Sequence, residues 1–300
     1  MRRLVKMFLN RYGYDIIKTE RFQARKGTKE RKIMVGNFMI GMPQNNIQLV
    51  NYKIQPGLNM EIGRLASAVH KKYPGMTAID IGANTGDTIS IIRSAVDCPV
   101  IGIEGDDVSY NFLERNVKQF KNVSIEKVFL GERSEKMNVH MGSEGWNNTI
   151  IPTKSEGKEV SFRTLNEVIA EKYAMHDIKF VKLDIEGYDT IALRGAQNVI
   201  TQHKPVIIFE YNRDVMNVIR EDGLSTLLSF KTIGYNKVIF FDHLGRMLLS
   251  TFLHNEAEII DLHNYGIGKG NLLGYYDICL FHSNDDDIAA DFTKAEKECL

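Results

Sequence analysis

The sequence predicts an α/β protein with an open, mostly parallel sheet covered by helices on both faces. Two observations lead to this fold class. Short apolar runs alternate with segments of helical periodicity, and a Gly-x-x-x-Gly turn, Gly82 to Gly86, joins one apolar run to a helix. Four of the runs end in an acidic residue: Asp80, Glu104, Asp184 and Glu210. Because open α/β sheets bind ligands at the carboxyl ends of their strands, we expect a ligand site there.

The composition is that of a globular protein, with 300 residues of which 43% are hydrophobic and 25% charged. No apolar run approaches the roughly 18 residues of a membrane-spanning helix. The three cysteines, Cys98, Cys279 and Cys299, are too widely spaced for a metal motif or a disulfide framework. We therefore expect a soluble protein in a reducing compartment, the cytoplasm.

The first 32 residues are strongly basic, with eleven Lys or Arg against three acids. Apolar residues recur there at helical spacing from Leu4 to Tyr12, before Gly13. We favour a short helix docked on its own domain with a solvated basic face. The alternative is a basic amphipathic segment that touches an anionic membrane at the inner face. Nucleic acid is not expected as a partner, since the remaining chain is net acidic without a basic stripe, and the sequence gives no signal for an oligomeric state.

The pattern divides the chain into an N-terminal extension, residues 1–58, and a main domain, residues 59–300. Glycine and proline interrupt residues 33–58, which we expect to form one or two short strands. Asn59 is a candidate cap for a helix that ends at Pro74-Gly75. After the first strand, turn and helix, a second strand covers 99–103, and Asp106 or Asp107 caps a helix that runs to about residue 120.

The middle of the chain is predicted to hold a strand over Val123 to Leu130. Irregular strand and loop follow over residues 136–163, with strand segments at 136–141 and 159–163 around a polar insert. Trp146, the only tryptophan, lies in a glycine-flanked loop, where it is expected to be a packing anchor, with a lid or sugar platform as the alternative. Thr164 and Glu167 have the spacing of a capping box, so we expect a helix from there to about residue 175.

The last third begins with strands at 178–184 and 206–209, separated by a helix. Helical stretches follow at about 213–221 and 223–233, then strands near 236–241, 246–252 and 276–281. This strand-rich ending predicts a closing hairpin with one antiparallel strand at or near the edge. The acidic residues 284–287 and the last helix are expected to be solvated surface.

The residues of the central turn favour S-adenosylmethionine over a dinucleotide. The G-x-G-x-x-G fingerprint is missing, and Asp80 would repel a pyrophosphate but suits a ligand with an amino group and a sulfonium. Glu104 can accept hydrogen bonds from both ribose hydroxyls. Glu132 is placed to meet an adenine amino group, with a simple turn as an equal alternative. The predicted cofactor-binding residues are Asp80, Gly82, Asn84, Thr85, Gly86, Glu104, Gly105, Asp106 and Glu132.

Several segments resemble, in order, those of the FkbM-type methyltransferases. They are 79–86 (IDIGANTG), 102–104 (GIE), 181–187 (VKLDIEG), 193–196 (LRGA) and 204–210 (KPVIIFE), within a match over about residues 76–282. The resemblance implies a class I S-adenosylmethionine-dependent enzyme with a Rossmann-like sheet of seven strands, one of them antiparallel. It also implies methylation of hydroxyls on sugars or sugar-bearing compounds. Two departures are Gly105, where the family often has proline, and Asp189, where many members have glutamate.

Methyl transfer to a hydroxyl requires an aligned acceptor and a group that takes its proton. We expect Asp184 and Glu186 to fill these roles, one as general base and the other orienting the acceptor. Lys182 is expected to tune their charge or contact the substrate, with a structural pairing to Asp184 or Glu210 as the alternative. A divalent cation held by Asp184, Glu186 and Glu210 is a further alternative, which we do not favour because no dedicated metal loop is present.

The sequence thus predicts an O-methyltransferase that acts on a sugar, a glycan or a glycosylated, lipid-linked acceptor. One alternative is a non-catalytic, cofactor-binding scaffold in envelope glycan assembly. A less favoured one is an NAD-linked oxidoreductase, against which the missing fingerprint and Asp80 count.

Overall fold

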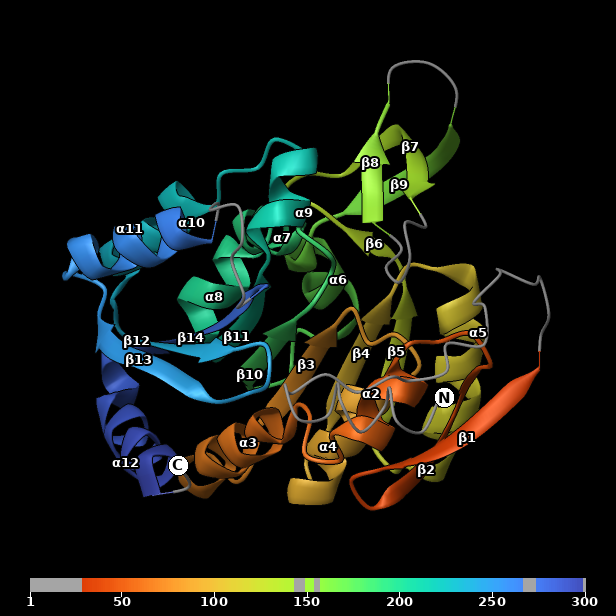
Figure 1. The fold of residues 1–300 in the computed structure, drawn as a ribbon, viewed down its shortest axis with the longest axis horizontal. Coiled ribbons are helices and arrows are strands. Elements are labelled where there is room, and N and C mark those ends of the chain that lie inside the picture. Colours follow the sequence, from red (N-terminus) through yellow and green to blue (C-terminus); the bar gives the residue numbers. More distant parts are fainter. Residues whose placement is uncertain (1–28, 143–148, 154–156, 267–273, 299–300) are drawn as a thin grey trace, which may run out of the picture.

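The computed structural model describes residues 29–142, 149–153, 157–266 and 274–298 (Figure 1). The basic segment before residue 29 and Trp146 lie outside these ranges, so the expectations for them stay predictions. Within the described residues, no helix is both long and apolar enough to cross a membrane.

The core of the molecule is an eight-stranded sheet with the order β13-β12-β14-β11-β10-β3-β4-β5. Its strands are β3 (Thr77–Ile81), β4 (Val100–Glu104), β5 (Val123–Lys127), β10 (Ile178–Leu183), β11 (Val206–Tyr211), β12 (Tyr235–Asp242), β13 (Met247–Phe252) and β14 (Tyr276–His282). The five strands from β5 to β11 pair in parallel, and β14 is antiparallel to both of its neighbours. The predicted α/β class is confirmed.

The sheet has one strand more than the seven that the resemblance implies, because β12 and β13 form an edge hairpin. Asp242 stabilises its turn: the carboxylate accepts from the backbone N–H groups of Leu244 and Arg246, each at 2.9 Å. Gly245 has φ +72°, a conformation that favours glycine. The local turn chemistry thus adds a second antiparallel strand, β13, to the expected β14.

Helices cover both faces of the sheet, as the alternation of strands and helices predicted (Figure 1). One face packs against α3 (Met60–Lys72), α4 (Asp87–Ala95), α5 (Asp107–Asn116) and α12 (Asp286–Glu298). The other packs against α6 (Leu165–Lys172), α7 (Asp189–Arg194), α8 (Gln197–His203), α10 (Leu224–Ser229) and α11 (Glu256–Tyr265). The alternating strand residues divide accordingly: Ile79 and Ile81 belong to the α7 side, whereas Ala78 and Asp80 lie on the α3 side.

Two of the three predicted helix caps are present, and the third is not. Asp106 caps α5, accepting from the N–H groups of Val108 and Ser109, and Thr164 with Glu167 forms the capping box of α6. Asn59 precedes α3 but adopts φ +62° and makes no side-chain cap bond. At this position the chain uses the left-handed conformation that asparagine tolerates, instead of the predicted side-chain cap.

The N-terminal extension forms the hairpin β1 (Glu30–Val35) and β2 (Phe38–Pro43), followed by α2 (Gln48–Ile54), which the sequence did not predict. The hairpin is fixed to the main domain by Asn116 of α5, which exchanges two hydrogen bonds with the backbone of Gly41 at 3.0 and 2.7 Å. The Tyr52 hydroxyl of α2 donates to Asp87 of α4 at 2.9 Å. These contacts hold α2 beside the carboxyl edge of the sheet.

A separate four-stranded sheet, with the order β6-β9-β7-β8, lies after β5, and its strands β7 and β9 match the strand segments expected at 136–141 and 159–163. Its strands are β6 (Phe129–Leu130), β7 (Glu135–Gly142), β8 (Thr149–Pro152) and β9 (Lys158–Arg163). The single strand predicted over 123–130 is therefore two strands that belong to different sheets. The remaining elements are α9 (Arg213–Val218) and the 3-10 turns η1 (Val117–Gln119), η2 (Phe230–Ile233) and η3 (Ser283–Asp285).

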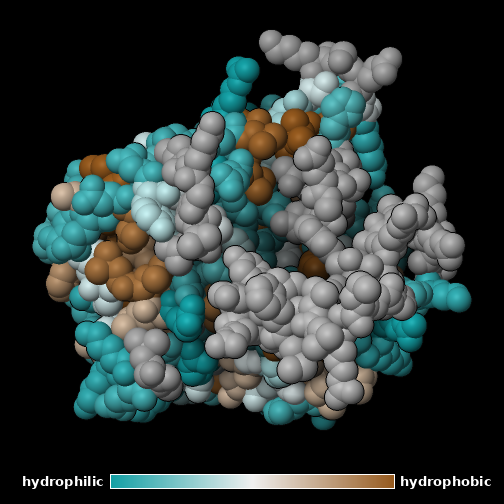
Figure 2. Space-filling model, in the orientation of Figure 1, coloured by the Kyte–Doolittle hydropathy of each residue, from teal (hydrophilic) through white to brown (hydrophobic). Residues whose placement is uncertain are grey.

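The acidic segment before α12 and α12 itself were expected to be solvated surface, but Asp285 is buried and Ile288 and Phe292 of α12 belong to the core. The Lys72 ammonium lies 3.0 Å from the Asp285 carboxylate, and the Tyr73 hydroxyl donates to it at 2.6 Å. Among the coloured residues of Figure 2, which are those that the structure describes, hydrophilic residues predominate and hydrophobic residues form small groups.

Candidate functional site

The turn between β3 and α4 is built against the end of β10. Gly82 has φ +75°, and a Cβ there would lie 1.9 Å from the carbonyl oxygen of Asp184. Gly86, with φ +89°, precedes the first turn of α4. Both predicted glycine positions therefore need glycine, since a side chain at 82 would collide with backbone and both dihedrals are left-handed.

Glu104 ends β4 beside this turn. Its carboxylate accepts from the backbone N–H of Asn84 at 2.8 Å and from that of Asp106 at 2.7 Å. Burial raises its pKa to about 7, against the opposing effect of these two hydrogen bonds. A carboxylate has about four lone-pair sites, so Glu104 keeps acceptor capacity for a ligand's hydroxyls.

A cavity of about 390 Å³ opens above the turn. Five of the predicted cofactor residues line it: Gly82, Asn84, Glu104, Gly105 and Asp106. Thr85 is buried and Gly86 directly precedes α4. Neither residue lines the cavity, so both contribute to the shape of the turn.

Asp80 is fully buried and is not the unpaired carboxylate that the sequence suggested. The Lys182 ammonium lies 3.1 Å from Asp80, also donates to the carbonyl of Gly82 at 3.3 Å, and is 3.9 Å from Asp184. Burial alone would lower the pKa of Lys182, but the Asp80 and Asp184 carboxylates more than offset this and raise it. The structural pairing of Lys182 with Asp184, one of the two alternative partners, is therefore present, but the shorter contact is with Asp80, its register partner on the neighbouring parallel strand, which the sequence did not predict.

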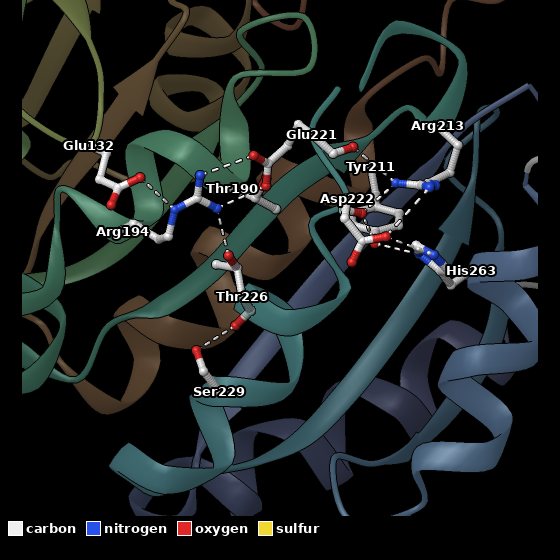
Figure 3. Close-up of polar contacts among 10 residues, drawn as sticks. All are labelled: Glu132, Thr190, Arg194, Tyr211, Arg213, Glu221, Asp222, Thr226, Ser229 and His263. Carbon is white, nitrogen blue, oxygen red and sulfur yellow. Dashed lines mark hydrogen bonds and ion pairs between the residues drawn. The ribbon is translucent and has the colours of Figure 1, made fainter. Parts of the chain in front are cut away.

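Glu132 does not line the cavity, because Arg194 holds its carboxylate elsewhere (Figure 3). The Arg194 guanidinium donates to Glu132 at 2.9 Å, to Glu221 at 2.8 and 3.0 Å, and to Thr226 at 2.7 Å. This Arg194 cluster joins the turn after β6 to α7, to the loop before α10 and to α10 itself. The structure thus gives Glu132 a structural partner in place of the expected adenine contact.

A second cavity, of about 350 Å³, adjoins the first on the side of α2 and β14. The two share the lining residues Ile47, Gln48, Asp184 and Glu186. The second is also lined by Lys182, Glu210, Asn212, His243, Tyr275 and Asp277. Of these only Lys182 and Glu210 were predicted near the site, because the others come from loops and strands that carry no ligand motif.

The two predicted catalytic carboxylates lie where the cavities meet, on the turn after β10. Glu186 and Gly187 have φ +55° and +87°, and the backbone N–H of Ile185 donates to the buried Asp189 carboxylate at 3.2 Å. Burial, with the nearby Asp184, raises the pKa of Asp189 to about 7. The turn therefore presents Asp184 and Glu186 to both cavities.

Metal-ligand geometry gives the divalent cation no support. Within the described residues, no three or more His, Cys, Asp or Glu side chains are grouped so that they could hold an ion.

The parallel sheet, the glycine turn and the strand-end carboxylates around one cavity define an α/β domain for a nucleoside-bearing cofactor. Residues 80–223 match the model of the methyltransferase FkbM domain, so the chain carries an FkbM methyltransferase domain and the resemblance is confirmed. This family is one of S-adenosylmethionine-dependent methyltransferases, which leaves the NAD-linked alternative without support.

Among solved structures, the chain is similar to methyltransferase FkbM from Methylobacillus flagellatus KT, with 19% identity, 59% of this chain and 43% of that chain covered, and a TM-score of 0.41. It is also similar to a putative caffeoyl-CoA O-methyltransferase from Staphylococcus aureus, with 12% identity and a TM-score of 0.42. That match covers 78% of this chain and 89% of the other. A third similar structure is that of M. jannaschii TYW2 in complex with AdoMet. The identity is 12%, the match covers 86% of this chain and 87% of that chain, and the TM-score is 0.38. The match thus spans less than half of the Methylobacillus protein. A search of curated proteins found no match.

Proposed function

We propose that this protein transfers the methyl group of S-adenosylmethionine to a hydroxyl of a sugar, a glycan or a glycosylated acceptor. The observation that carries the proposal is the junction of two cavities at Asp184 and Glu186. One cavity has the glycine turn and strand-end glutamate of a cofactor site, and the other has the volume of a small-molecule site, about 300 Å³ or more.

The residues around the first cavity fit the cofactor. Glu104 is fixed by two backbone N–H groups and retains acceptor sites for ribose hydroxyls. Because Gly82 has no side chain, the turn can lie directly against the residue that follows β10. Asn84, Gly105 and Asp106 would complete the contacts to the nucleoside. When bound, S-adenosylmethionine supplies an electrophilic methyl group on a sulfonium.

The chain's own contribution is to orient the acceptor and remove its proton. A sugar hydroxyl is a weak acid, so its proton must pass to a base as its oxygen bonds to the methyl carbon. A carboxylate oxygen of Asp184 or Glu186 is positioned at the cavity junction to take that proton. The Lys182 ammonium lies 3.9 Å from Asp184 and places a positive charge beside that carboxylate.

The lining of the second cavity supports a hydroxyl-rich acceptor. The side-chain amides of Gln48, Asn51, Gln55, Asn59 and Asn212 supply donors and acceptors for sugar hydroxyls. Among the described lining residues, Lys182 is the only side chain with a fixed positive charge, and Asp80 already pairs with it. We therefore place any phosphate of a lipid-linked acceptor outside this cavity.

The first test is calorimetric titration with S-adenosylmethionine and NAD in parallel, for wild type and Glu104→Ala. We expect S-adenosylmethionine binding that the variant loses, and no NAD binding. A glycan panel, read by release of S-adenosylhomocysteine, then tests turnover. We expect Asp184→Asn to keep cofactor affinity and to lower turnover about 10²- to 10⁴-fold. Binding of NAD alone, or full turnover by Asp184→Asn, would contradict the proposal, and binding without turnover would support the scaffold alternative.

A further inference from the structure

The second cavity contains two carboxylates on directly opposed positions of neighbouring strands. Glu210 of β11 and Asp277 of β14 are register partners in an antiparallel pair, and both line the cavity. Carboxylates at opposed positions repel each other, which destabilises the strand pair when both are ionised. Such a pair calls for an explanation beyond sheet stability.

Glu210 is also an unsatisfied side chain within this wall. Its exposed fraction is 7%, and its Oε1 atom has no hydrogen-bond partner among the residues that the structure describes. A buried acceptor without a partner destabilises the folded state, and a charged one does so more strongly. An acceptor that is held open at such a cost and faces a cavity indicates a missing donor.

The surrounding acidic groups oppose ionisation of this pair in the absence of a cation. Burial and neighbouring carboxylates raise the pKa of Glu210 and that of Asp277 well above the usual range. The charged groups that act on the pair are Asp184, Glu186 and Asp189 from the turn after β10, Glu61 from α3, and Lys182 from β10. Since Lys182 already pairs with Asp80 at 3.1 Å, the cavity wall has more acid than base.

We infer that the methyl acceptor carries a protonated amino group, and that this ammonium binds in the second cavity beside Glu210 and Asp277. The inference rests on the proposed function and narrows its substrate class to an amino-bearing sugar. An ammonium brings three donors and a positive charge, so it both satisfies Glu210 and relieves the repulsion between the opposed carboxylates. A neutral hydroxyl supplies a donor but no charge. A divalent ion would need several converging ligands, and no such group occurs among the described residues.

The test uses the full chain saturated with S-adenosylhomocysteine. Glucosamine, galactosamine, mannosamine and 6-amino-6-deoxyglucose are titrated beside their N-acetyl and hydroxyl counterparts. We expect at least one amino sugar to bind about tenfold or more tightly than both counterparts. Glu210→Gln should remove most of this preference, and Asp277→Asn provides a second variant if the first does not fold. Asn51→Ala, an uncharged lining residue, should weaken amino and neutral sugars alike and keep the preference.

Three results would overturn the inference: no amino sugar is preferred, the preference is unchanged in both carboxylate variants, or Mg²⁺ instead stabilises the wild type through Glu210. Binding of S-adenosylhomocysteine by the wild type shows whether the ammonium site alone or the whole proposed function is wrong. If the wild type does not bind S-adenosylhomocysteine, the proposed function fails. If it binds S-adenosylhomocysteine normally and shows no amino preference, the ammonium site alone is wrong.

Discussion

Glu104 joins the end of β4 to the cofactor cavity, and its charge depends on pH near neutrality. Burial raises its pKa to about 7 from the ordinary 4.5. Its contribution to folding stability is therefore fully present below about pH 4.5 and is lost as the pH rises through about 7. Hydroxyl donors bind an ionised carboxylate more strongly than a neutral acid, so cofactor affinity should follow the opposite trend.

We therefore predict that affinity for S-adenosylhomocysteine falls about tenfold between pH 8 and pH 6. Calorimetry across this range measures the effect. Glu104→Gln should bind more weakly at pH 8 and show a flat pH profile. An equal pH dependence in wild type and variant would assign the titration to another group.

At the same scale, the sequence predicted the residues whose chemistry follows from a motif. Gly82, Asn84, Glu104 and Asp184 could be found because glycine spacing and strand-end acids are visible in one dimension. The pairing of Lys182 with Asp80 could not, since it depends on the register between strands about one hundred positions apart in the chain. For Glu132 the sequence left a ligand contact and a simple turn equally open, because the side-chain partner that the structure shows, Arg194, is 62 positions away in the chain.

At the scale of elements, the Arg194 cluster holds the small sheet, α7 and α10 together (Figure 3). Arg194→Ala would leave the largely buried Glu221 without its guanidinium partner. We predict a loss of about 1–3 kcal/mol in the free energy of unfolding, measured by urea denaturation. The matched control is Lys136→Ala, which removes an exposed ion pair with Glu159 and should change stability by at most about 1 kcal/mol. Equal effects of the two substitutions would show that the Arg194 cluster is not a structural clamp.

The elements that the sequence missed are short or lack a clear period. In α2, seven residues long, only Leu49 and Tyr52 are buried, which is too few to establish a helical stripe. In α11 the buried positions are Ile259 and His263, and a histidine is not read as part of an apolar face. In the small sheet, strand segments were expected at 136–141 and 159–163, where β7 and β9 lie, whereas β8, only four residues long, was missed. Tertiary packing, and not local preference, decides these segments.

At the scale of the whole molecule, the proposed cofactor cavity is lined by residues from distant parts of the chain, since residues 43 and 45–48 line it beside the strand ends. Ligand binding should therefore stabilise the entire fold. At about 100 times the dissociation constant, S-adenosylhomocysteine should add about 2.7 kcal/mol, which raises the melting temperature by several degrees. Thermal denaturation measures this shift. Glu104→Ala should lose most of it and NAD should produce none, whereas equal shifts with both ligands would indicate non-specific stabilisation.

The two cavities share one wall at Asp184 and Glu186, but their outer walls come from different segments. His243, Leu244 and Tyr275 line only the second cavity, and Phe129, Ile150 and Tyr188 line only the first. Substitutions in the β12–β13 turn or just before β14 thus change the second cavity and leave every side chain that lines the first cavity in place. Such a division allows the range of acceptors to diverge while the machinery that holds the methyl donor stays constant.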